Sequence, residues 1–561
     1  MLRFDYYPTF YWLPTYALCW GLLWLAARQM LGYRLFLTLA LGLLFLLRLP
    51  SIAFNDEINP DESQMLAQAL TLRHDPVYFQ SVDGTTAGPL DSYFLLLPNL
   101  LGLPFDYITA HLMAFGLVAV CLWLLFRTAR LWFGEWAARL ALLPLVFMLG
   151  LTQNGDFLHY SSELIALVLL SWCYYLYAVQ LKQKQPKLGR IALIGLLLGM
   201  VPFGKLQAVP LAAVVGLFVL IDLLSRRTMT APAKAGRVVL LGACATLFPL
   251  LVVGLMWLNG VYDDFVTFYI FGNFQYASNT SQLQSLLHLP DFFRKGDEFD
   301  WLMKLTVGIW LTGVGLALRR GARFDCRAVL VGGFGLVLLA ATLFAITRTG
   351  SSYVHYLYFL TGPLMFGLAY GWQQLQTSNR WVQGAGLGAM AVFLALFGTE
   401  TKQRYQHGIV VNPYSSEEQD GWTVQPSPVS NEIAKYARPG EKLVVWGWRC
   451  DYYVKTQMPQ GVAENHSIRS AFAHPLLATY QQRYVQNFLR SFPPVFVDAV
   501  GNENLWMTDR ATQGHEIIEP LGRFVAAHYT YVALVSDARI YVRNDRLLQK
   551  TPAFTQASKF K

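Results

Sequence analysis

The stretch Tyr33-Arg-Leu-Phe-Leu-Thr-Leu-Ala-Leu-Gly-Leu-Leu-Phe-Leu-Leu-Arg-Leu-Pro50 is apolar at nearly every position. A helix that crosses a bilayer needs about 20 mainly apolar residues. Eleven similar segments lie at 9–29, 106–126, 136–153, 162–181, 189–204, 206–225, 238–258, 301–318, 328–346, 353–372 and 381–398. The sequence therefore predicts a mainly α, polytopic transmembrane bundle of about 11–13 spans. Whether residues 9–29 span the membrane stays open, because Pro14 and several tyrosines also suit an interfacial helix.

The composition also indicates a membrane protein. Hydrophobic residues make up 54% of the chain and charged residues only 14%, whereas soluble proteins carry charge on about 25% of residues. Aromatic residues reach 15%, and Trp and Tyr suit membrane interfaces. The net charge is +9, but no basic stretch is interleaved with stacking aromatics as a nucleic-acid site needs. The lipid bilayer, and no nucleic acid, is therefore the expected partner.

The charges between the apolar segments predict the orientation. Alternate connections hold eighteen Lys or Arg and two acids, at 28–34, 127–139, 182–190, 225–237, 319–327 and 373–380. The connection at 51–105 instead holds seven acids and one Arg. Because basic loops stay in the cytoplasm, we expect the loops 51–105 and 259–300, and everything after about residue 400, on the outer side.

The last part of the chain has a different character. After residue 400 charges become frequent and balanced, and short β-rich runs appear at 442–446, 495–498 and 531–535. A helix-like stretch at 475–488 lies between them. This pattern predicts a C-terminal extracytoplasmic α/β domain at 400–561 that follows a transmembrane domain at 1–399.

The first outer loop contains the most informative segment, Phe54-Asn-Asp-Glu-Ile-Asn-Pro-Asp-Glu-Ser63. Pro60 can begin a helix, and Asp61 and Glu62 then lie in its first turn, where the helix dipole favours acids. That explanation is purely structural. The functional alternative is a carboxylate at the membrane surface, where partial desolvation raises its pKa and makes it a better base.

A second group of polar residues follows the fourth apolar segment. Asp156, His159 and Glu163 are spaced by three and four residues, so one helix would present all three on one face. Such a face could in principle bind a divalent cation, although carboxylate–His pairs more often form a simple hydrogen-bonded network.

Three further residues are candidates for contact with an anion. Lys205 and Arg348 stand at the outer ends of apolar segments, with His355 one turn further in. Arg binds phosphate in a bidentate manner and Lys acts as a point charge. The same positions also fit side chains that extend to the interface, and a hydrogen-bonded histidine inside the bundle.

Taken in order, these segments resemble the GT-C superfamily of membrane glycosyltransferases, especially the protein O-mannosyltransferase and aminoarabinose–lipid A transferase type. The resemblance spans most of the chain. The matching segments are Asp61-Glu62, Gly88-Pro-Leu-Asp-Ser-Tyr93, Gln153-Asn-Gly-Asp-Phe-Leu-His-Tyr160, Gly199-Met-Val-Pro-Phe-Gly-Lys205, Tyr353-Val-His-Tyr-Leu-Tyr-Phe-Leu-Thr-Gly-Pro363 and Val444-Val-Trp-Gly-Trp448.

The resemblance implies an activity and roles for residues. Members transfer one sugar from a polyprenyl-phosphate donor, here of the undecaprenyl type, to an acceptor hydroxyl with inversion. This implies a periplasmic active site at a bacterial inner membrane, with a glycolipid or glycan as acceptor. The implied catalytic residues are Asp61 as the base, Glu62 as an orienting group and Asp156 as a second acid. The remaining expected residues are Lys205, Arg348, His355 and Tyr356 for the donor phosphate, and His159, Glu163 and Tyr93 for positioning the acceptor.

No cofactor is certain from the sequence. A divalent cation, Mg²⁺ or Mn²⁺, is left open, with Asp61 and Asp156 as its ligands if one binds. Relatives that modify lipid A often carry a Lys just before the Pro-containing motif, whereas this chain has Thr85-Thr-Ala-Gly88. The phosphate contacts must then come from elsewhere.

Two other functions remain open from the sequence. A transporter or flippase of a lipid-linked substrate would fit twelve spans and the broken helix pair near residues 202–205, although the acids gather in outer loops. An oligosaccharide ligase or oligosaccharyltransferase would share the carrier and the orientation but move a larger glycan. The identity of the sugar and of the acceptor, metal dependence and oligomeric state are not predicted.

Overall fold

The computed structural model describes residues 10–276, 281–321, 326–407 and 423–548. The chain forms two compact units. The first, here the helical unit, comprises Met1–Glu62, Thr85–Phe94 and Asp106–Thr423. The second, here the tail unit, comprises Ser63–Gly84, Leu95–Phe105 and Val424–Lys561. Part of the connection 51–105 therefore groups with the C-terminal residues.

All twelve predicted apolar segments are helical. They are α1 (Trp12–Ala27), α2 (Tyr33–Ile52), α6 (Tyr107–Phe133), α7 (Glu135–Leu151), α8 (Leu164–Leu181), α9 (Leu188–Gly204), α10 (Val209–Ser225), α11 (Ala231–Leu258), α16 (Glu298–Arg319), α17 (Cys326–Thr347), α18 (Thr361–Gln376) and α19 (Arg380–His407). Within the described residues, eight helices are long and apolar enough to cross a membrane. The other four, α1, α7, α9 and α18, have 16 or 17 residues. The predicted polytopic, mainly α bundle is confirmed.

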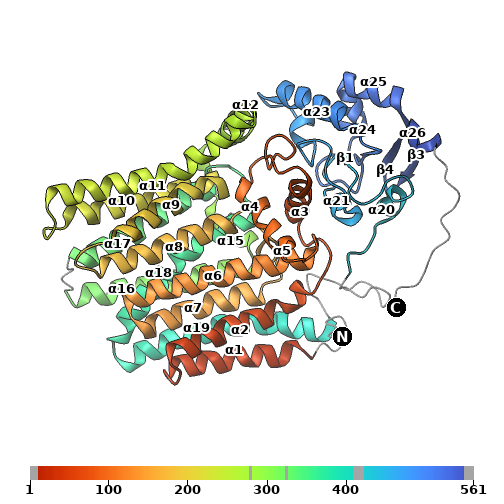
Figure 1. The fold of residues 1–561 in the computed structure, drawn as a ribbon. Coiled ribbons are helices and arrows are strands. Elements are labelled where there is room, and N and C mark those ends of the chain that lie inside the picture. The colour runs from red at the N-terminus through yellow and green to blue at the C-terminus, as the bar shows by residue number, and fades with distance from the viewer. Residues whose placement is uncertain (1–9, 277–280, 322–325, 408–422, 549–561) are drawn as a thin grey trace. The chain divides into compact units, whose positions relative to one another are not determined.

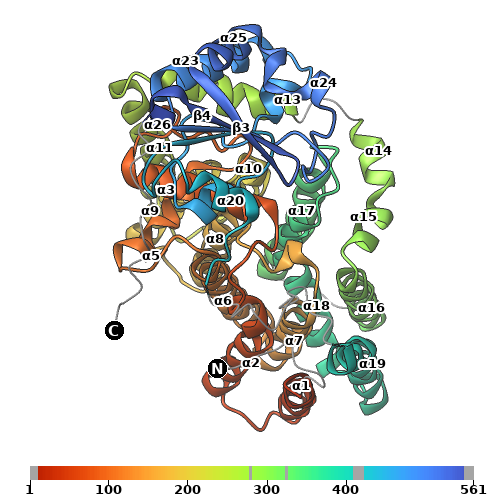
Figure 2. The ribbon, with the colours of Figure 1, turned by 90° about the vertical axis from the view of Figure 1, so that its right-hand side faces the viewer.

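Helix α7 forms the centre of the helical unit. Every residue from Trp136 to Leu151 is buried, as expected for a helix that is apolar on all sides. It packs against α2, α6 and α18, and the long helices run side by side (Figure 1). The view along their axes shows α1, α2, α7, α18 and α19 as neighbouring coils (Figure 2).

Helices α9 and α11 approach each other closely because glycines face the contact. A Cβ atom at Gly199 would collide with the carbonyl oxygen of Ala245, so a larger residue cannot occupy this position without a shift of the backbone. Helix α9 ends at Gly204, and Lys205 adopts an extended conformation before η2 (Leu206–Ala208) and α10. The predicted break in this helix pair is confirmed.

Short helices form the connections of the two units. They are α3 (Pro60–His74), α4 (Pro89–Phe94), α5 (Leu96–Leu100), η1 (Gly155–Phe157), α12 (Tyr262–Asp264), the π-helix η3 (Phe265–Phe271), α13 (Gly272–Tyr276), α14 (Gln282–Leu287), α15 (Leu289–Lys295) and η4 (Val354–Leu360).

The expectation of one helix through Asp156, His159 and Glu163 is wrong. Only Gly155–Phe157 is helical, as a single 3-10 turn, and α8 begins after Glu163. The side chain of Asn154 accepts a hydrogen bond from the backbone N–H of Asp156 at 3.0 Å, and a cap of this kind closes a local turn. The three side chains therefore do not share one helix face.

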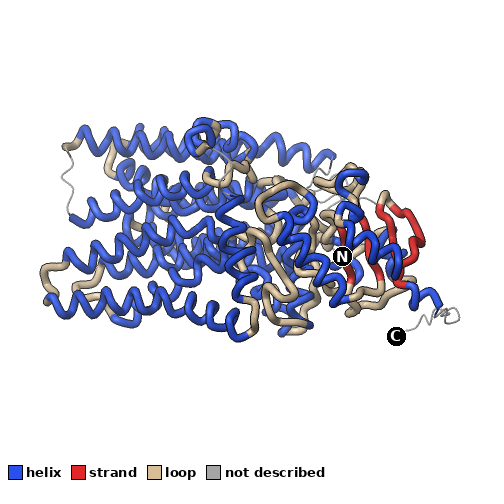
Figure 3. The backbone as a smooth tube through the Cα atoms, turned by 90° about the horizontal axis from the view of Figure 1, so that it is seen from above, coloured by secondary structure: helices blue, strands red, loops and turns tan. Residues whose placement is uncertain are grey.

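The tail unit is built on a four-stranded sheet, as its β-rich runs predicted. The order is β1-β2-β4-β3, with β1 (Leu443–Trp446) parallel to β2 (Val495–Asp498). Strands β3 (Tyr529–Val535) and β4 (Ala538–Arg543) form an antiparallel hairpin, and β4 also pairs with β2. Figure 3 shows the strands gathered in this part of the chain. The helices of the C-terminal part are α20 (Pro428–Ile433), α21 (Asp451–Thr456), α22 (Ile468–Ala471), α23 (Leu477–Ser491), α24 (Arg510–Gln513), η5 (His515–Ile517), α25 (Glu519–His528) and α26 (Asn544–Leu548).

Each face of the sheet has its own apolar core. Leu443 and Val445 of β1 enter one cluster, and Val444 and Trp446 enter the other, because successive side chains of a strand point to opposite faces. Ala67 of α3 belongs to the first cluster. The residues of α3 from Ser63 onward thus belong to the tail unit, and Ala67 is part of its core.

Polar contacts fix the same loop segment within the tail unit. The backbone N–H of Asp83 donates to the carbonyl of Ala463 at 2.8 Å. The guanidinium of Arg483 pairs with the carboxylates of Asp83 and Glu464, and all three side chains are buried. Residues 63–84 are therefore an integral part of this unit.

Candidate functional site

Asp61 and Glu62 lie in the first turn of α3, as predicted. The side chain of Asn59 accepts a hydrogen bond from the backbone N–H of Asp61 at 3.0 Å. The Glu62 carboxylate turns back and accepts from the N–H of Ile58 at 2.5 Å. Reciprocal capping of this kind satisfies the free N–H groups at a helix start, and it leaves the Asp61 side chain to project from the turn.

Glu62 is fully buried and bound to helix α6. Its Oε2 lies 3.0 Å from Nε2 of His111. Burial disfavours the charged carboxylate, but the charge of His111 and the hydrogen bond from its ring outweigh burial and lower the pKa of Glu62. An ionised carboxylate whose oxygens are already hydrogen-bonded is better suited to anchoring the loop than to acting as a base.

Asp156 is joined to the first acidic segment by Asn59. The amide of Asn59 donates to Oδ1 of Asp156 at 2.7 Å, and Nδ1 of His355 lies 3.6 Å from the same oxygen. Burial opposes ionisation of Asp156, but the nearby His355 outweighs it, so the pKa of Asp156 is lowered. Two segments nearly a hundred residues apart in sequence thus meet in one site.

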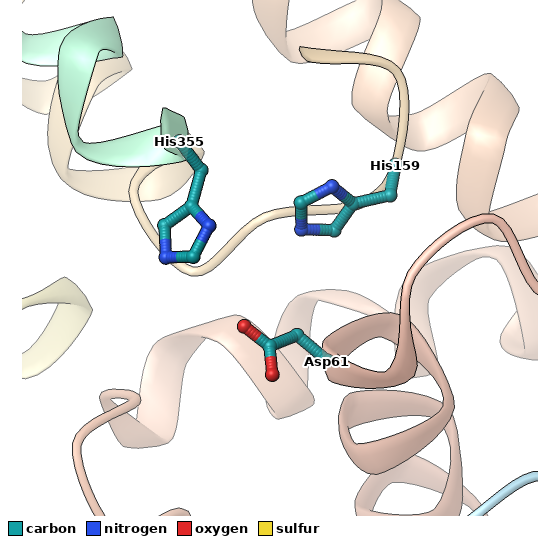
Figure 4. Close-up of side chains that lie close together, drawn as sticks. All are labelled: Asp61, His159 and His355. Carbon is teal, nitrogen blue, oxygen red and sulfur yellow. The ribbon is translucent and has the colours of Figure 1, made fainter. Parts of the chain in front are cut away.

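Asp61, His159 and His355 face one another (Figure 4). Their possible ligand atoms all lie within 4.8 Å of each other. Nδ1 of His159 is 2.9 Å from the carbonyl oxygen of Gly155, and a carbonyl can only accept, so Nδ1 carries the proton. In the neutral imidazole the buried Nε2 then holds a lone pair, and it has no hydrogen-bond partner among the described residues.

Lys205 lies inside the helical unit and not at its surface. Its side chain is nearly fully buried, with Nζ 2.8 Å from Oε1 of Glu163 and 2.5 Å from Oγ of Ser162. The Nζ atom also lies 5.7 Å from the ring centre of Tyr356. The alternative that Lys205 extends to the interface is therefore wrong.

Of the remaining predicted residues, Tyr356 contacts His355, whereas Tyr93 and Arg348 lie on other elements of the helical unit. Tyr356 is buried, and its ring packs edge-on against His355 with centres 4.9 Å apart. Tyr93 is half-buried in α4. Arg348 is half-buried after α17, and none of the described contacts joins it to Asp61 or Asp156.

Three residues of the site were not predicted. Asn59 connects the two acidic segments, His111 binds Glu62, and Asp91 is a fully buried carboxyl in α4. His111 carried a signal, since an ionisable residue within an apolar span is a functional candidate in its own right. Asn59 carried none, because its role depends on a contact with a distant loop.

A cavity of about 460 Å³ opens beside the segment that carries Asp156. Gln153 and Asn154 form one wall, and residues at the start of α16 form another. Its volume lies within the range of about 300–1,000 Å³ that is usual for small-molecule sites.

No protein-family model and no curated protein matches the sequence. Among solved structures, ArnT from Cupriavidus metallidurans bound to undecaprenyl phosphate has a TM-score of 0.54 at 14% sequence identity, over 90% of this chain and 97% of that chain. The same protein in the apo state has a TM-score of 0.50 at 12% identity over the same shares. The chain therefore has a fold similar to that of ArnT, which is the type of fold that its motifs predicted.

Proposed function

We propose that the protein transfers a monosaccharide from a polyprenyl-phosphate donor to an acceptor hydroxyl, at the outer face of a bacterial inner membrane. The observation that carries this proposal is the convergence of Asp61, Asp156, His159 and His355 at the ends of an apolar bundle with the GT-C fold. The solved structure of ArnT, whose fold is similar, contains undecaprenyl phosphate.

Asp61 is the proposed base. The described hydrogen bonds engage its backbone N–H and leave its carboxylate oxygens available. In the reaction, the acceptor oxygen attacks the anomeric carbon and its proton passes to Asp61. The bond from that carbon to the phosphate oxygen breaks, and the phosphate leaves with the electron pair. Attack from the side opposite the phosphate inverts the anomeric centre.

The leaving phosphate needs cations or hydrogen-bond donors and no strong acid. Lys205 and His355 are the proposed groups, because both are buried near the acids and can act in a site that excludes water. Tyr356 packs against both and offers a phenolic hydroxyl. None of the described contacts joins the side chain of Arg348 to these groups.

The arrangement also fits a divalent cation. Asp61, His159 and His355 supply one carboxylate and two imidazoles, and the lone pair on Nε2 of His159 is unused. Such a mixed set suits Zn²⁺ or Mn²⁺, whereas Mg²⁺ prefers oxygen ligands. A bound cation would neutralise charge on the leaving phosphate. We therefore propose that a bound cation would be held by His159, His355 and one carboxylate oxygen of Asp61, in place of the pair Asp61 and Asp156. The other oxygen of Asp61 would then take the acceptor proton, and Lys205 would remain as the protein cation for the phosphate.

The test is transfer by the purified protein from a polyprenyl-phosphate sugar. Asp61→Asn keeps the volume of the side chain and removes the base, so we expect turnover to fall by about 10²–10⁴-fold, with an unchanged melting temperature. Asp56→Asn, on the same loop, is the matched control. Full activity of Asp61→Asn would exclude it as the base.

The same assay separates the alternatives. A transporter or flippase would form no glycosylated product from purified donor and acceptor. An oligosaccharide ligase or oligosaccharyltransferase would add several sugars in one step, and the mass of the product distinguishes this from one sugar.

A further inference from the structure

The cavity beside the Asp156 segment is lined by a carboxylate that is buried and that has no cationic partner among the described residues. Glu298 is 3% exposed and lines the cavity. Its Oε2 accepts a hydrogen bond from the hydroxyl of Thr152 at 2.9 Å, and no ion pair within the described residues includes it. A buried carboxylate is normally paired with a cation or with several donors, so the cavity side of Glu298 lacks donors that a ligand would supply.

Hydrogen bonds connect Glu298 to the proposed catalytic segment. The hydroxyl that donates to Glu298 also accepts from the N–H of Asn154 at 3.1 Å, and the Asn154 side chain accepts from the N–H of Asp156 at 3.0 Å. Two residues of chain span at most about 7 Å. The cavity wall at Asn154 is therefore within that distance of Asp156, measured between Cα atoms.

The lining does not have the geometry of a metal site. In the described parts of the chain, the groups whose ligand atoms converge include neither Asp297, Glu298 nor Asp300. The ligand atoms of these three carboxylates therefore do not all lie within 4.8 Å of one another. Separate acceptors suit a ligand that carries several donors at different places, such as the hydroxyl groups of a saccharide.

Other lining groups agree with a saccharide. Gln153, Asn154 and Gln403 offer amides, which both donate and accept hydrogen bonds. The half-buried indole of Trp301 is held edge-on against Phe397, with ring centres 5.3 Å apart. Aromatic faces with a few placed polar groups are typical of sites that bind small molecules.

The charge of the cavity selects among saccharides. Four acids line it, Asp297, Glu298, Asp300 and Glu400, against the single cation Arg294. Lys304 pairs with Asp300 at 2.5 Å, whereas no ion pair of the described residues includes Glu298. Clefts lined by one sign of charge attract ligands of the opposite sign and repel ligands of the same sign.

We propose that this cavity binds the glycan of the acceptor, and that it selects an uncharged or amino-bearing saccharide over a phosphorylated one. This inference rests on the proposed function. Glu298 accepts hydrogen bonds from the hydroxyl or amino groups of the glycan, and Trp301 packs against a sugar ring.

The experiment measures binding of three acceptors to the whole protein in detergent without donor. The probes are an uncharged glycolipid, a glycolipid with an amino sugar, and phosphorylated lipid A. We expect the first two to bind more tightly than lipid A. Glu298→Gln should weaken the binding of these two probes by about ten-fold or more, since a hydrogen bond to a charged group contributes that much. Trp301→Ala should weaken their binding by a similar factor, because it removes the ring that packs against a sugar. Glu135→Gln is the matched control on another connection.

Transfer is measured separately with the same variants. We expect Glu298→Gln to raise KM for the acceptor, to leave KM for the donor unchanged, and to reduce the discrimination against lipid A. A merely structural role would instead alter both KM values and the melting temperature. Tightest binding of lipid A, with no effect of Glu298→Gln, would overturn the proposal. Because binding needs no turnover, a failure of this proposal is distinguishable from a failure of the transferase activity.

Discussion

At the scale of single residues, the site is defined by which polar atoms are already satisfied. Glu62 and Asn59 use their hydrogen bonds to hold the loop in place. Asp61 and Nε2 of His159 do not, although both lie close to Asp156 and His355. Unused polar atoms in a buried cluster distinguish groups that can bind a substrate from groups that hold structure.

His159 provides the sharpest test of the proposed cation. We expect the purified protein to bind Zn²⁺ or Mn²⁺, and His159→Ala to weaken binding by at least about ten-fold, because one of three ligands is lost. Titration calorimetry with the metal ion alone measures this. His74→Ala, at the far end of α3, is the control. Equal binding by both variants would place the metal elsewhere.

The buried carboxyl of Asp91 should make the stability of the protein depend on pH. Burial, aided by the charge of Glu163 and only partly opposed by Lys205, raises the pKa of Asp91 well above its ordinary value. The contribution of this carboxyl to the free energy of unfolding is therefore fully present below its unfolded pKa of about 3.9. It decreases as the pH rises from there toward the pKa of Asp91 in the folded protein. Asp91→Asn removes that dependence. In thermal unfolding, the stability of Asp91→Asn relative to the wild type should increase as the pH rises above about 4. A difference that does not change with pH would show that Asp91 is ionised in the folded protein.

At the scale of elements, local patterns predicted well what local forces decide. The apolar segments, the β-rich runs and the helix start at Pro60 follow from periodicity and capping, and all are present. The predicted helix through Asp156 and Glu163 failed because Asn154 caps a single turn. The meeting of Asn59 with Asp156 depends on packing between distant segments, which no local pattern encodes.

In the buried ion group of the tail unit, loss of the cation should destabilise the fold more than loss of one carboxylate charge. Arg483→Met leaves the carboxylates of Asp83 and Glu464 buried without their cation, which destabilises by about 3–5 kcal/mol. Glu464→Gln should be milder, because burial already raises the pKa of Glu464 and Arg483 keeps Asp83 as a partner. Hydrogen exchange of the β2 amides would measure both. Equal loss of protection would contradict this account.

At the scale of the whole molecule, the charge pattern of the loops predicts the orientation. An Asn502→Cys variant in the tail unit should react with a membrane-impermeant thiol reagent in intact cells. A Gln376→Cys variant, next to a basic connection, should react only after permeabilisation, because basic loops stay in the cytoplasm. Both positions are exposed. The opposite labelling would invert the proposed orientation and place the site in the cytoplasm.

The discontinuous composition of the tail unit has a consequence for biosynthesis. Residues 63–84 leave the ribosome long before residues 424–561, yet Ala67 and Asp83 complete the core and the ion group of that unit. Domains usually fold in the order of synthesis, but here the early segment must wait for the last part of the chain. During that interval its apolar and acidic side chains lack their final partners, so a chain that stops short of the C-terminal residues is a natural substrate for quality-control proteases.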